Sequence, residues 1–571
     1  MRRDVLTSLA HAALALAAVI AVWRALQQAW VTELAPDEPV LLALRVSFPL
    51  MAAAGSALAI AAGRLGGREL LFVALDAASL FGLLLGVFLL SLGPFSREVA
   101  GVVLVLVLAI RLAPAAWWIA SRAAPAWLVF AASFVAYAVL AIWFRASSLP
   151  LGDQVFYLLA TERLGQGTVH AEIDPSAFRA LLGTESTDID RATHVADTPV
   201  GPRLVQGYAI PILLLPGHAL LGPLGAYLTV ALFAAWTSAQ TYLLLRETVA
   251  RPALAGAVWL LAAFLPPLLP LATHVYPNVF GAAALVTAYR LLLTAPVRSP
   301  GLAGALLAAT FFLTPRDGLA FVALAPFALR LGPALASPFF ATALAVLALA
   351  VVVNTALYAL PLPYAGYVYG TAAAQAAVGL PSFTFFFWVG LPAILFDRTF
   401  GIAGSAPWLF LAALGAYAAL RIDRARLLPA AAAIAVTLVA LSLFRYWEGG
   451  YAPPNRYLVN VLPLAAPFVA HGLGIALARP SVRVVAIGLV ALSALAGLLL
   501  AAVPTLGLNT AFDHRLQDLL DDVLGLNPLG WLPSFQPVSE DWYVAAYLRL
   551  VPAVALVAIL AWLGVRRTER A

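Results

Sequence analysis

The segment Gly152-Asp153-Gln154-Val155-Phe156-Tyr157-Leu158 opens the longest polar stretch of the chain, which covers residues 146–207. This stretch follows an apolar run that ends at Phe144, so Asp153 is expected at the edge of a membrane span. An Asp at such an edge commonly caps a helix, because its carboxylate accepts hydrogen bonds from free backbone amides. A functional role stays open beside capping, since several polar residues accompany Asp153 in an otherwise apolar chain.

The composition indicates a membrane protein. Hydrophobic residues make up 63% of the 571 positions and charged residues only 11%, which is too little polar surface for a soluble globule. The chain has no Cys, so disulfides, thiolate metal sites and a cysteine nucleophile are excluded. All 33 basic residues are Arg, a bias typical of a GC-rich bacterial coding sequence. They are dispersed through loops, so the net charge of +6 does not predict nucleic-acid binding.

Apolar runs predict an all-α polytopic membrane protein with about sixteen transmembrane helices, each near the ~20 residues that cross the bilayer. Full or near-full spans are expected at 9–23, 41–62, 70–90, 102–119, 125–144, 226–245, 254–271, 279–293, 341–357, 408–420, 428–443, 458–478, 482–503 and 544–565. Two shorter runs, 302–313 and 319–331, predict a hairpin that turns within the membrane. The run 208–221 would be roughly 21 Å long as a helix, so it should lie at the interface or re-enter.

The distribution of Arg orients these spans. Loops on one side carry most Arg and few acids, whereas the other side carries nearly all Asp and Glu. By the positive-inside rule, both termini are cytoplasmic and the large loop 146–207, after the fifth helix, faces outward. We therefore expect a multi-pass protein of the bacterial cell (inner) membrane.

Four polar clusters fall on the predicted outer side. They contain Asp153 with His194, then His274 with Tyr276, then Arg398 within 396–407, and finally Arg445 and Arg456 within 445–457. Charges at the lipid boundary are costly unless they meet water or a partner, so convergence on one cavity is the economical explanation. For each Arg taken singly, the alternative is that its side chain simply extends to water at the membrane surface. For Tyr276, the alternative is an aromatic residue at the membrane–water interface.

These motifs resemble a known superfamily. The Gly152-Asp153 motif, His194 and the run Gln206-Gly207-Tyr208-Ala209-Ile210-Pro211 to Pro216-Gly217 are similar to glycosyltransferases of the C type (GT-C), which use polyprenyl-phosphate sugars. That superfamily includes protein O-mannosyltransferases, aminoarabinose transferases and related bacterial enzymes. The likeness covers roughly residues 125–503, and Tyr276-Pro277-Asn278 and the segment 397–407 also fit the bacterial members. The superfamily commonly has a second acid after the loop Asp, where this chain has Gln154.

The resemblance implies three regions. Residues 1–122 would be an accessory four-helix membrane region, 123–504 a GT-C-like core that includes the loop 146–207, and 505–571 an outer loop and a last transmembrane helix. In the accessory region, Asp76 and Arg111 match in depth within neighbouring apolar spans, which favours a structural ion pair. The alternative is that Arg111 snorkels to the inner surface and Asp76 is a neutral acid bonded to the backbone.

The resemblance also implies a reaction, in which a sugar moves from a polyprenyl-phosphate donor to a lipid, glycan or protein acceptor of the cell envelope. An inverting displacement needs a carboxylate to take the acceptor proton and positive charge to hold the leaving phosphate. Asp153 is the expected base. The expected substrate- and phosphate-binding residues are Arg316, Arg398, Arg445, Arg456, His194, His274 and Tyr276. The residues predict no metal site, and Gln154 argues against one built on that position. Whether the reaction needs a divalent cation, Mg²⁺ or Mn²⁺, stays open.

Two other functions stay open. A solute transporter or lipid flippase would place charged residues and broken helices near the bilayer midplane. A polysaccharide polymerase or ligase is chemically close to a GT-C enzyme but usually has its large outer loop late in the chain, as the segment 505–541 would be.

Overall fold

The structure is a computed structural model of the chain. It describes residues 105, 124–148, 150, 152–171, 194–293, 297, 299–314, 316, 318–363, 365–370, 387–444, 447–450, 452–508, 515–519, 521, 527, 529–535 and 542–570. The expected spans 9–23, 41–62 and 70–90, nearly all of 102–119, the Asp76–Arg111 pair and Arg445 lie outside these residues.

The described chain is mostly helical. Its first half comprises α5 (Ala126–Ser147), α6 (Asp153–Gly165), β1 (Val195–Thr198), β2 (Gly201–Leu204), α9 (Ala209–Leu221), α10 (Pro223–Thr248), α11 (Pro252–Phe264), α12 (Leu268–Leu271) and α13 (Pro277–Leu293). There follow α14 (Pro300–Leu313), α15 (Leu319–Ala328), η1 (Leu329–Leu331), α16 (Pro333–Tyr358), α17 (Ala365–Val368), α20 (Phe387–Phe396), α21 (Ile402–Ser405), η2 (Pro407–Phe410) and α22 (Leu411–Ile422). The last elements are α23 (Arg424–Ser442), η3 (Arg456–Leu458), α24 (Leu462–Leu477), α25 (Pro480–Ala502), η4 (Pro504–Gly507), α26 (Arg515–Asp518) and α27 (Trp542–Arg570).

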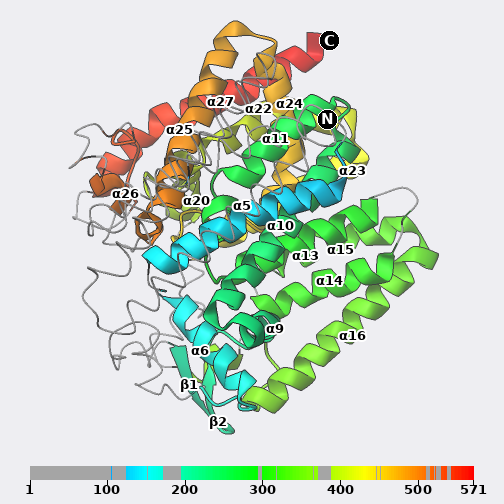
Figure 1. Ribbon diagram of the computed structural model, residues 1–571. Helices are drawn as coiled ribbons and strands as arrows, with labels where there is room; N and C mark the ends of the chain where they lie inside the picture. The colour runs from blue at the N-terminus through cyan, green and yellow to red at the C-terminus, as the bar shows by residue number, and fades with distance from the viewer. Residues whose placement is uncertain are drawn as a thin grey trace, which may run out of the picture.

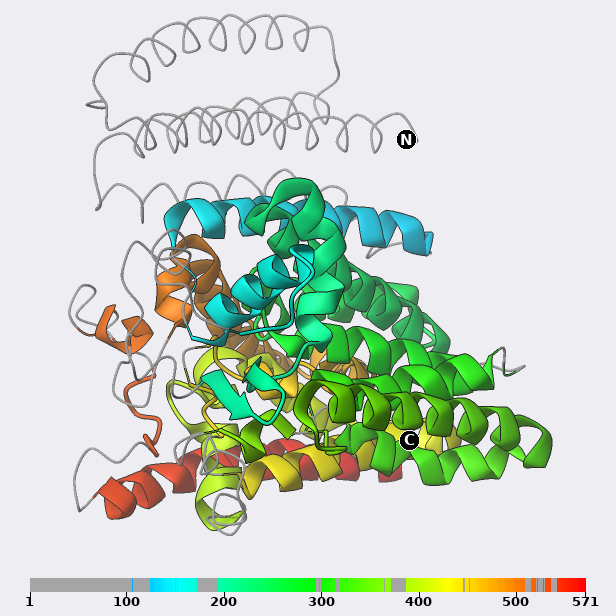
Figure 2. The ribbon, with the colours of Figure 1, turned by 90° about the horizontal axis from the view of Figure 1, so that it is seen from below.

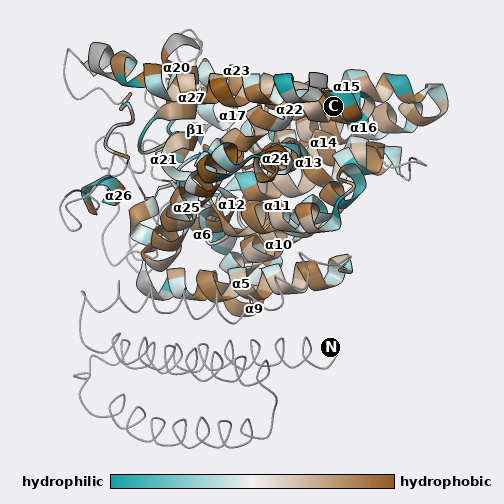
Figure 3. Ribbon diagram, turned by 90° about the horizontal axis from the view of Figure 1, so that it is seen from above, coloured by the Kyte–Doolittle hydropathy of each residue, from teal (hydrophilic) through white to brown (hydrophobic). Residues whose placement is uncertain are grey.

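Six of the described helices are long and apolar enough to cross a membrane, namely α5, α10, α16, α23, α25 and α27. Shorter apolar helices include α9, α11, α13, α14 and α24. Hydrophobic residues line most of the length of these helices (Figure 3). These helices support the prediction of a helical chain with membrane-spanning character. The count of about sixteen spans stays a prediction.

Proline decides where many helices begin. Pro223 opens α10, Pro252 opens α11, Pro300 opens α14, Pro333 opens α16 and Pro480 opens α25. The first turn of a helix suits proline, because its missing N–H would have no partner there and its fixed φ matches the helix. Proline therefore sets helix starts in a chain whose apolar runs would otherwise be hard to divide.

One predicted span differs from the structure for an identifiable reason. The expected span 254–271 is divided into α11 and α12, because Pro266 and Pro267 cannot continue the helical hydrogen-bond ladder. The expected hairpin of 302–313 and 319–331 corresponds to α14 and to α15 with η1, and its turn within a membrane stays a prediction. Its first helix, α14, packs mainly against α13 and α16, while α15 packs mainly against α23. The structure also contains α20 in a region where no span was expected.

Helix α10 organises the described bundle. It packs against α5, α9, α11, α13 and α24, and the helices α5, α10, α13, α14 and α16 run side by side in that order (Figure 1). A second group is formed by α22, which packs against α24 and α27. Helices α5 and α27 lie on opposite faces of the bundle (Figure 2). The start of α5 and the end of α27 point toward one end, and α6 and the β1–β2 hairpin lie toward the other (Figure 1).

Glycines allow α22 and α24 to approach closely. A Cβ atom added to Gly415 would collide with the carbonyl oxygen of Phe468, and one added to Gly472 would collide with that of Leu411. Small residues of this kind let helix backbones meet in an apolar environment, where packing replaces the hydrophobic effect as the driving force.

We expect Gly415→Ala to lower the midpoint of thermal unfolding in detergent, because α22 and α24 must separate to admit the methyl group. Overpacking of this kind typically costs about 1–3 kcal/mol. Gly488→Ala on α25 is the matched control, since a Cβ atom there meets open space and alanine favours the helix. Equal midpoints for the two variants would contradict the role given to Gly415.

Candidate active site

Asp153 is the first residue of α6 and follows Gly152, whose φ of 58° places it in the left-handed region that glycine favours. No side-chain capping bond forms at this helix start, so Asp153 is not the helix cap that its position suggested. Its side chain is 26% exposed and turns toward three other segments instead. The carboxylate is therefore held by tertiary contacts.

Three side chains contact the Asp153 carboxylate. Nε2 of His194 lies 3.3 Å from Oδ1, and the amide of Gln206 donates to the same oxygen at 3.5 Å. Nη1 of Arg456 donates to Oδ2 at 3.4 Å. Both oxygens of Asp153 thus have partners, and these come from the hairpin region and from the segment before α24.

His194 is positioned by an aromatic ring and by the hairpin that follows it. Its imidazole stacks on Phe156 of α6, with ring centroids 3.7 Å apart and planes 4° from parallel. Strands β1 and β2 pair antiparallel, and the hydroxyl of Tyr358 donates to the Leu204 carbonyl at 2.7 Å. Nε of Arg203 donates to the carbonyl of Leu357 at 3.0 Å. The end of α16 therefore fixes the hairpin that presents His194 to Asp153.

Arg456 follows Asn455, a non-glycine residue with a φ of 60°. The Asn455 amide donates to the carbonyl of Gly401 at 3.1 Å and to the hydroxyl of Ser405 at 2.6 Å, which compensates the strain of that backbone conformation. Beyond Asp153, the Arg456 guanidinium donates from Nη2 to the hydroxyl of Tyr457 at 2.9 Å. The hydrogen bonds of Asn455 thus fix the backbone before Arg456, and the bond to Tyr457 fixes the Arg456 side chain.

A second guanidinium shares the ring of Tyr457. The central carbon of Arg316 lies 4.1 Å from the Tyr457 ring centroid and 4.8 Å from that of Phe444. The corresponding carbon of Arg456 lies 4.8 Å from Tyr457 and 4.9 Å from Tyr276. Aromatic faces attract cations, so Tyr457 holds two positive groups close together.

The electrostatics of the cluster favour the charged form of Asp153. Burial alone would raise its pKa, but the hydrogen bond from His194 and the charges of Arg456 and Arg316 outweigh burial and hold the pKa well below its usual range. Burial raises the pKa of Tyr367 to about 12, with a further contribution from the nearby charge of Asp153. Asp153 is therefore a carboxylate, and Tyr367 a neutral phenol, at neutral pH.

Positive charge exceeds negative charge in the described cluster. Two guanidiniums, of Arg316 and Arg456, face one carboxylate, and no hydrogen bond or ion pair joins the side chain of Arg316 to another described residue. Nε of Arg456 is buried and has no hydrogen-bond acceptor in the same described part of the chain. These spare donors and the surplus charge suit an anionic ligand with several oxygens, such as a phosphate.

His274, which the sequence predicts to bind substrate, lies in a buried position, and its Nε2 has no hydrogen-bond partner among the described residues. Its ring is buried, lies 4.3 Å from the ring of Phe144, and its Nδ1 is 2.7 Å from the carbonyl oxygen of Pro270. Burial lowers the pKa of His274 to about 4, so the ring is neutral at neutral pH. A neutral, buried imidazole that bonds a backbone carbonyl braces the turn that carries Tyr276.

The expected phosphate ligand Arg398 also lies in a different environment. It follows Asp397, whose buried carboxylate accepts from the backbone amides of Thr399, Phe400 and Phe535 at 2.8–2.9 Å. The backbone of Arg398 bonds Pro533 and Gln517 of the late loop, and no contact among the described residues joins its side chain to Asp153. Asp397 thus anchors the late loop to the turn between α20 and α21. Arg445, the remaining expected ligand, is outside the described residues.

Gln154 fills the position where the GT-C resemblance leads one to expect a second acid. It is fully buried, and its Oε1 accepts from the backbone amide of Val275 at 3.0 Å. Gln154 is therefore a structural amide that ties α6 to the turn before α13. Within the described parts of the chain, no group of three or more His, Cys, Asp or Glu side chains is arranged to hold a metal ion.

The structure brings together Asp153, His194, Arg316, Arg456 and Tyr276 from the expected set. It adds two residues to which sequence reasoning gave no role, Gln206 and Tyr457. Tyr457 had a weak signal, since it adjoins Arg456 in a polar segment. Gln206 opened the run that carried the GT-C resemblance, but its contact with Asp153 could not be predicted because it depends on how the hairpin folds back.

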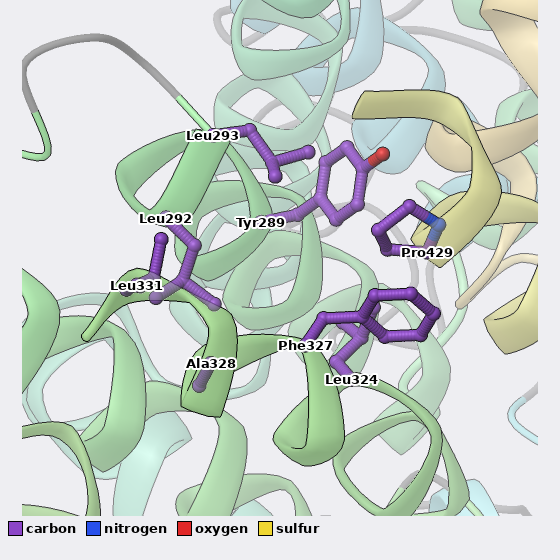
Figure 4. Close-up of a pocket in the computed structure, with 8 residues that line it drawn as sticks. All are labelled: Tyr289, Leu292, Leu293, Leu324, Phe327, Ala328, Leu331 and Pro429. Atoms are coloured by element: carbon purple, nitrogen blue, oxygen red, sulfur yellow. The ribbon is translucent and has the colours of Figure 1, made fainter. Parts of the chain in front are cut away.

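A separate crevice lies between α13, α15 with η1, and α23 (Figure 4). Its lining is apolar apart from Tyr289, whose hydroxyl donates to the backbone carbonyl of Arg426. None of the residues expected to bind substrate lines this crevice.

Comparison with known proteins identifies no relative: no protein-family model, curated protein or solved structure matches the chain.

Proposed function

We propose that the chain is a membrane glycosyltransferase, which moves a hexosyl or pentosyl group from a polyprenyl-phosphate donor to a hydroxyl of a cell-envelope acceptor. The observation that carries this proposal is the pairing of one ionised carboxylate, Asp153, with two guanidiniums on the ring of Tyr457. A sugar transfer from a lipid phosphate requires both a base and a cationic site for the leaving group.

The proposed step balances as a single displacement. The acceptor O–H gives its proton to the carboxylate of Asp153, and the acceptor oxygen forms a bond to the anomeric carbon. The bond between that carbon and the phosphate oxygen breaks, and its electron pair leaves with the polyprenyl phosphate. Arg316 and Arg456 stabilise the charge that develops on that phosphate. His194 and Gln206 orient the carboxylate through their contacts with Oδ1.

The location of the cluster favours an enzyme over a transporter. Asp153 begins α6, Arg316 lies in the turn between α14 and α15, and Arg456 precedes α24. Asp153 and Arg456 are thus the first residues of α6 and of the short helix η3, and Arg316 lies in a turn. Transporter sites, by contrast, commonly use broken helices near the bilayer midplane. A lipid-linked donor reaches a site at the membrane edge from within the bilayer.

The membrane arrangement belongs to the same proposal. A GT-C-like core at 123–504, about sixteen spans and cytoplasmic termini would place the cluster on the outer face of the inner membrane. The described helices support it in one respect, since the start of α5 and the end of α27 point toward the same end of the bundle (Figure 1).

The central test is glycosyl transfer by the purified protein. Incubation with radiolabelled polyprenyl-phosphate sugars and membrane extract should give a labelled product. Asp153→Asn should lower the rate roughly 100-fold or more, because it removes the basic oxygen and keeps the shape. Asp423→Asn, which changes the charge equally at the start of α23, is the control and should stay active. A rate for Asp153→Asn above about a tenth of the wild-type rate would exclude Asp153 as the base.

Arg316 and Arg398 provide a matched pair of variants. Arg316→Gln should raise the KM for the donor by about tenfold, because a charged contact to phosphate of roughly 1.4 kcal/mol is lost. Arg398→Gln should change the KM little, since Arg398 lies in the Asp397 turn. Steady-state kinetics over donor concentration measures both KM values. A raised KM for Arg398→Gln together with an unchanged KM for Arg316→Gln would mean that Arg398, and not Arg316, binds the phosphate.

Cysteine accessibility tests the orientation, and the native chain has no Cys to interfere. Val200 lies exposed in the β1–β2 hairpin, and Ala250 lies exposed between α10 and α11. We expect a membrane-impermeant maleimide to label Val200→Cys from outside intact cells and Ala250→Cys only after the inner face is opened. Labelling of Val200→Cys only from the inner face would invert the topology and remove the proposed site from the outer surface.

A further inference from the structure

We propose that Arg456 masks Asp153 in the ligand-free protein, and that the donor phosphate unmasks the base by taking Arg456 away from it. This inference rests on the proposed function, because the competing anion is the phosphate of a polyprenyl donor. Its consequence is an order of events in which the base gains its full basicity only after the donor is bound.

The geometry provides the masking contact. Oδ2 of Asp153 accepts from Nη1 of Arg456 at 3.4 Å, and the side chains are 26% and 10% exposed, respectively. An ion pair shielded from water to this extent stabilises the carboxylate strongly. A carboxylate stabilised in this way is a weak base, so the resting contact opposes the role that the reaction requires.

The same geometry provides the means of exchange. No hydrogen bond or ion pair joins the side chain of Arg316 to another described residue, so it can meet an incoming phosphate from its place on the rings of Tyr457 and Phe444 without breaking either kind of bond. Both guanidiniums contact the ring of Tyr457, so a phosphate bound by Arg316 lies close to Arg456. Phosphate oxygens accept paired hydrogen bonds from a guanidinium and therefore compete with the single contact to Asp153.

The other groups around Asp153 do not take the place of Arg456, and Arg316, whose charge also stabilises the carboxylate, would be held by the same phosphate. His194 and Gln206 contact Oδ1, on the opposite side of the carboxylate from Arg456. Tyr157 and Tyr367 are close enough for the charge of Asp153 to act on them, and burial raises the pKa of Tyr367 to about 12. When a phosphate takes Arg456, His194 and Gln206 therefore still orient the carboxylate of Asp153, but its negative charge is less stabilised. A less stabilised carboxylate accepts a proton more readily and is a more effective base.

The exchange also accounts for product release. Once Asp153 has accepted the acceptor proton it is neutral and no longer attracts Arg456, so the phosphate product retains both guanidiniums. When Asp153 returns its proton to solvent, the carboxylate again competes for Arg456. Re-formation of the ion pair then weakens the hold on the product.

The test measures lipid-phosphate binding rather than turnover. Purified protein in nanodiscs is titrated with decaprenyl phosphate, and with decaprenol as the uncharged probe. Asp153→Asn should bind decaprenyl phosphate about tenfold more tightly than the wild type, which corresponds to about 1.4 kcal/mol. Decaprenol binding should not change. The gain should vanish when Asp153→Asn is combined with Arg456→Gln.

Two further variants complete the experiment. Asp423→Asn removes another acid that contacts an arginine, Arg426 at 3.5 Å, and should leave binding unchanged, which excludes a general effect of net charge. Asp153→Ser gives a second way to remove the carboxylate if Asp153→Asn does not fold. Unchanged affinity in the folded Asp153 variants, or a gain that persists without Arg456, would overturn the inference. A wild-type protein that binds decaprenol as well as decaprenyl phosphate would instead overturn the proposed function.

Discussion

The ion pair between Asp153 and Arg456 joins segments 303 positions apart in the chain, and the rest of the site is arranged around it. Two charges removed from water must be matched closely, because desolvation otherwise exceeds their attraction. The bundle meets this requirement through α10, which packs against both α5 and α24 and so fixes the start of α6 relative to the segment before α24. Asn455 and the rings of Tyr276 and Tyr457 then set the guanidinium within that frame.

An apolar environment explains why the polar chemistry lies in connections. Backbone groups in a bilayer must bond within the helix, so spans are continuous helices whose interiors are mostly apolar. Proline at helix starts and glycine at close contacts shape the bundle without adding charge. The charged residues of the site lie at helix starts or in a turn, since Asp153 begins α6, Arg456 begins η3 and Arg316 lies between α14 and α15.

The sequence predicted the features that depend on local pattern. Apolar runs located most described helices, and the polar stretch after Phe144 singled out Asp153. Features that depend on distant pairing could not be predicted in this way. The stacking of His194 on Phe156, the return of Gln206 to Asp153 and the buried position of His274 follow from packing, which periodicity does not encode. The position of Arg398 beside the Asp397 turn, away from Asp153, could not be predicted for the same reason, since an outer position does not determine which neighbour a side chain meets. Its role as a phosphate ligand stays a prediction.

The cluster must reconcile stability with reactivity. Two guanidiniums on one aromatic ring repel each other, and the structure limits the cost of this repulsion differently for each. Arg456 is neutralised by Asp153, whereas Arg316 keeps partial contact with solvent and the faces of Tyr457 and Phe444. Because Gln154 is neutral where a second acid was expected, a single described carboxylate faces these guanidiniums. Under the function that we propose, this carboxylate would have to be both counter-ion and base. It cannot be both at once, so the proposed reaction needs a second anion, which the phosphate of the donor would supply.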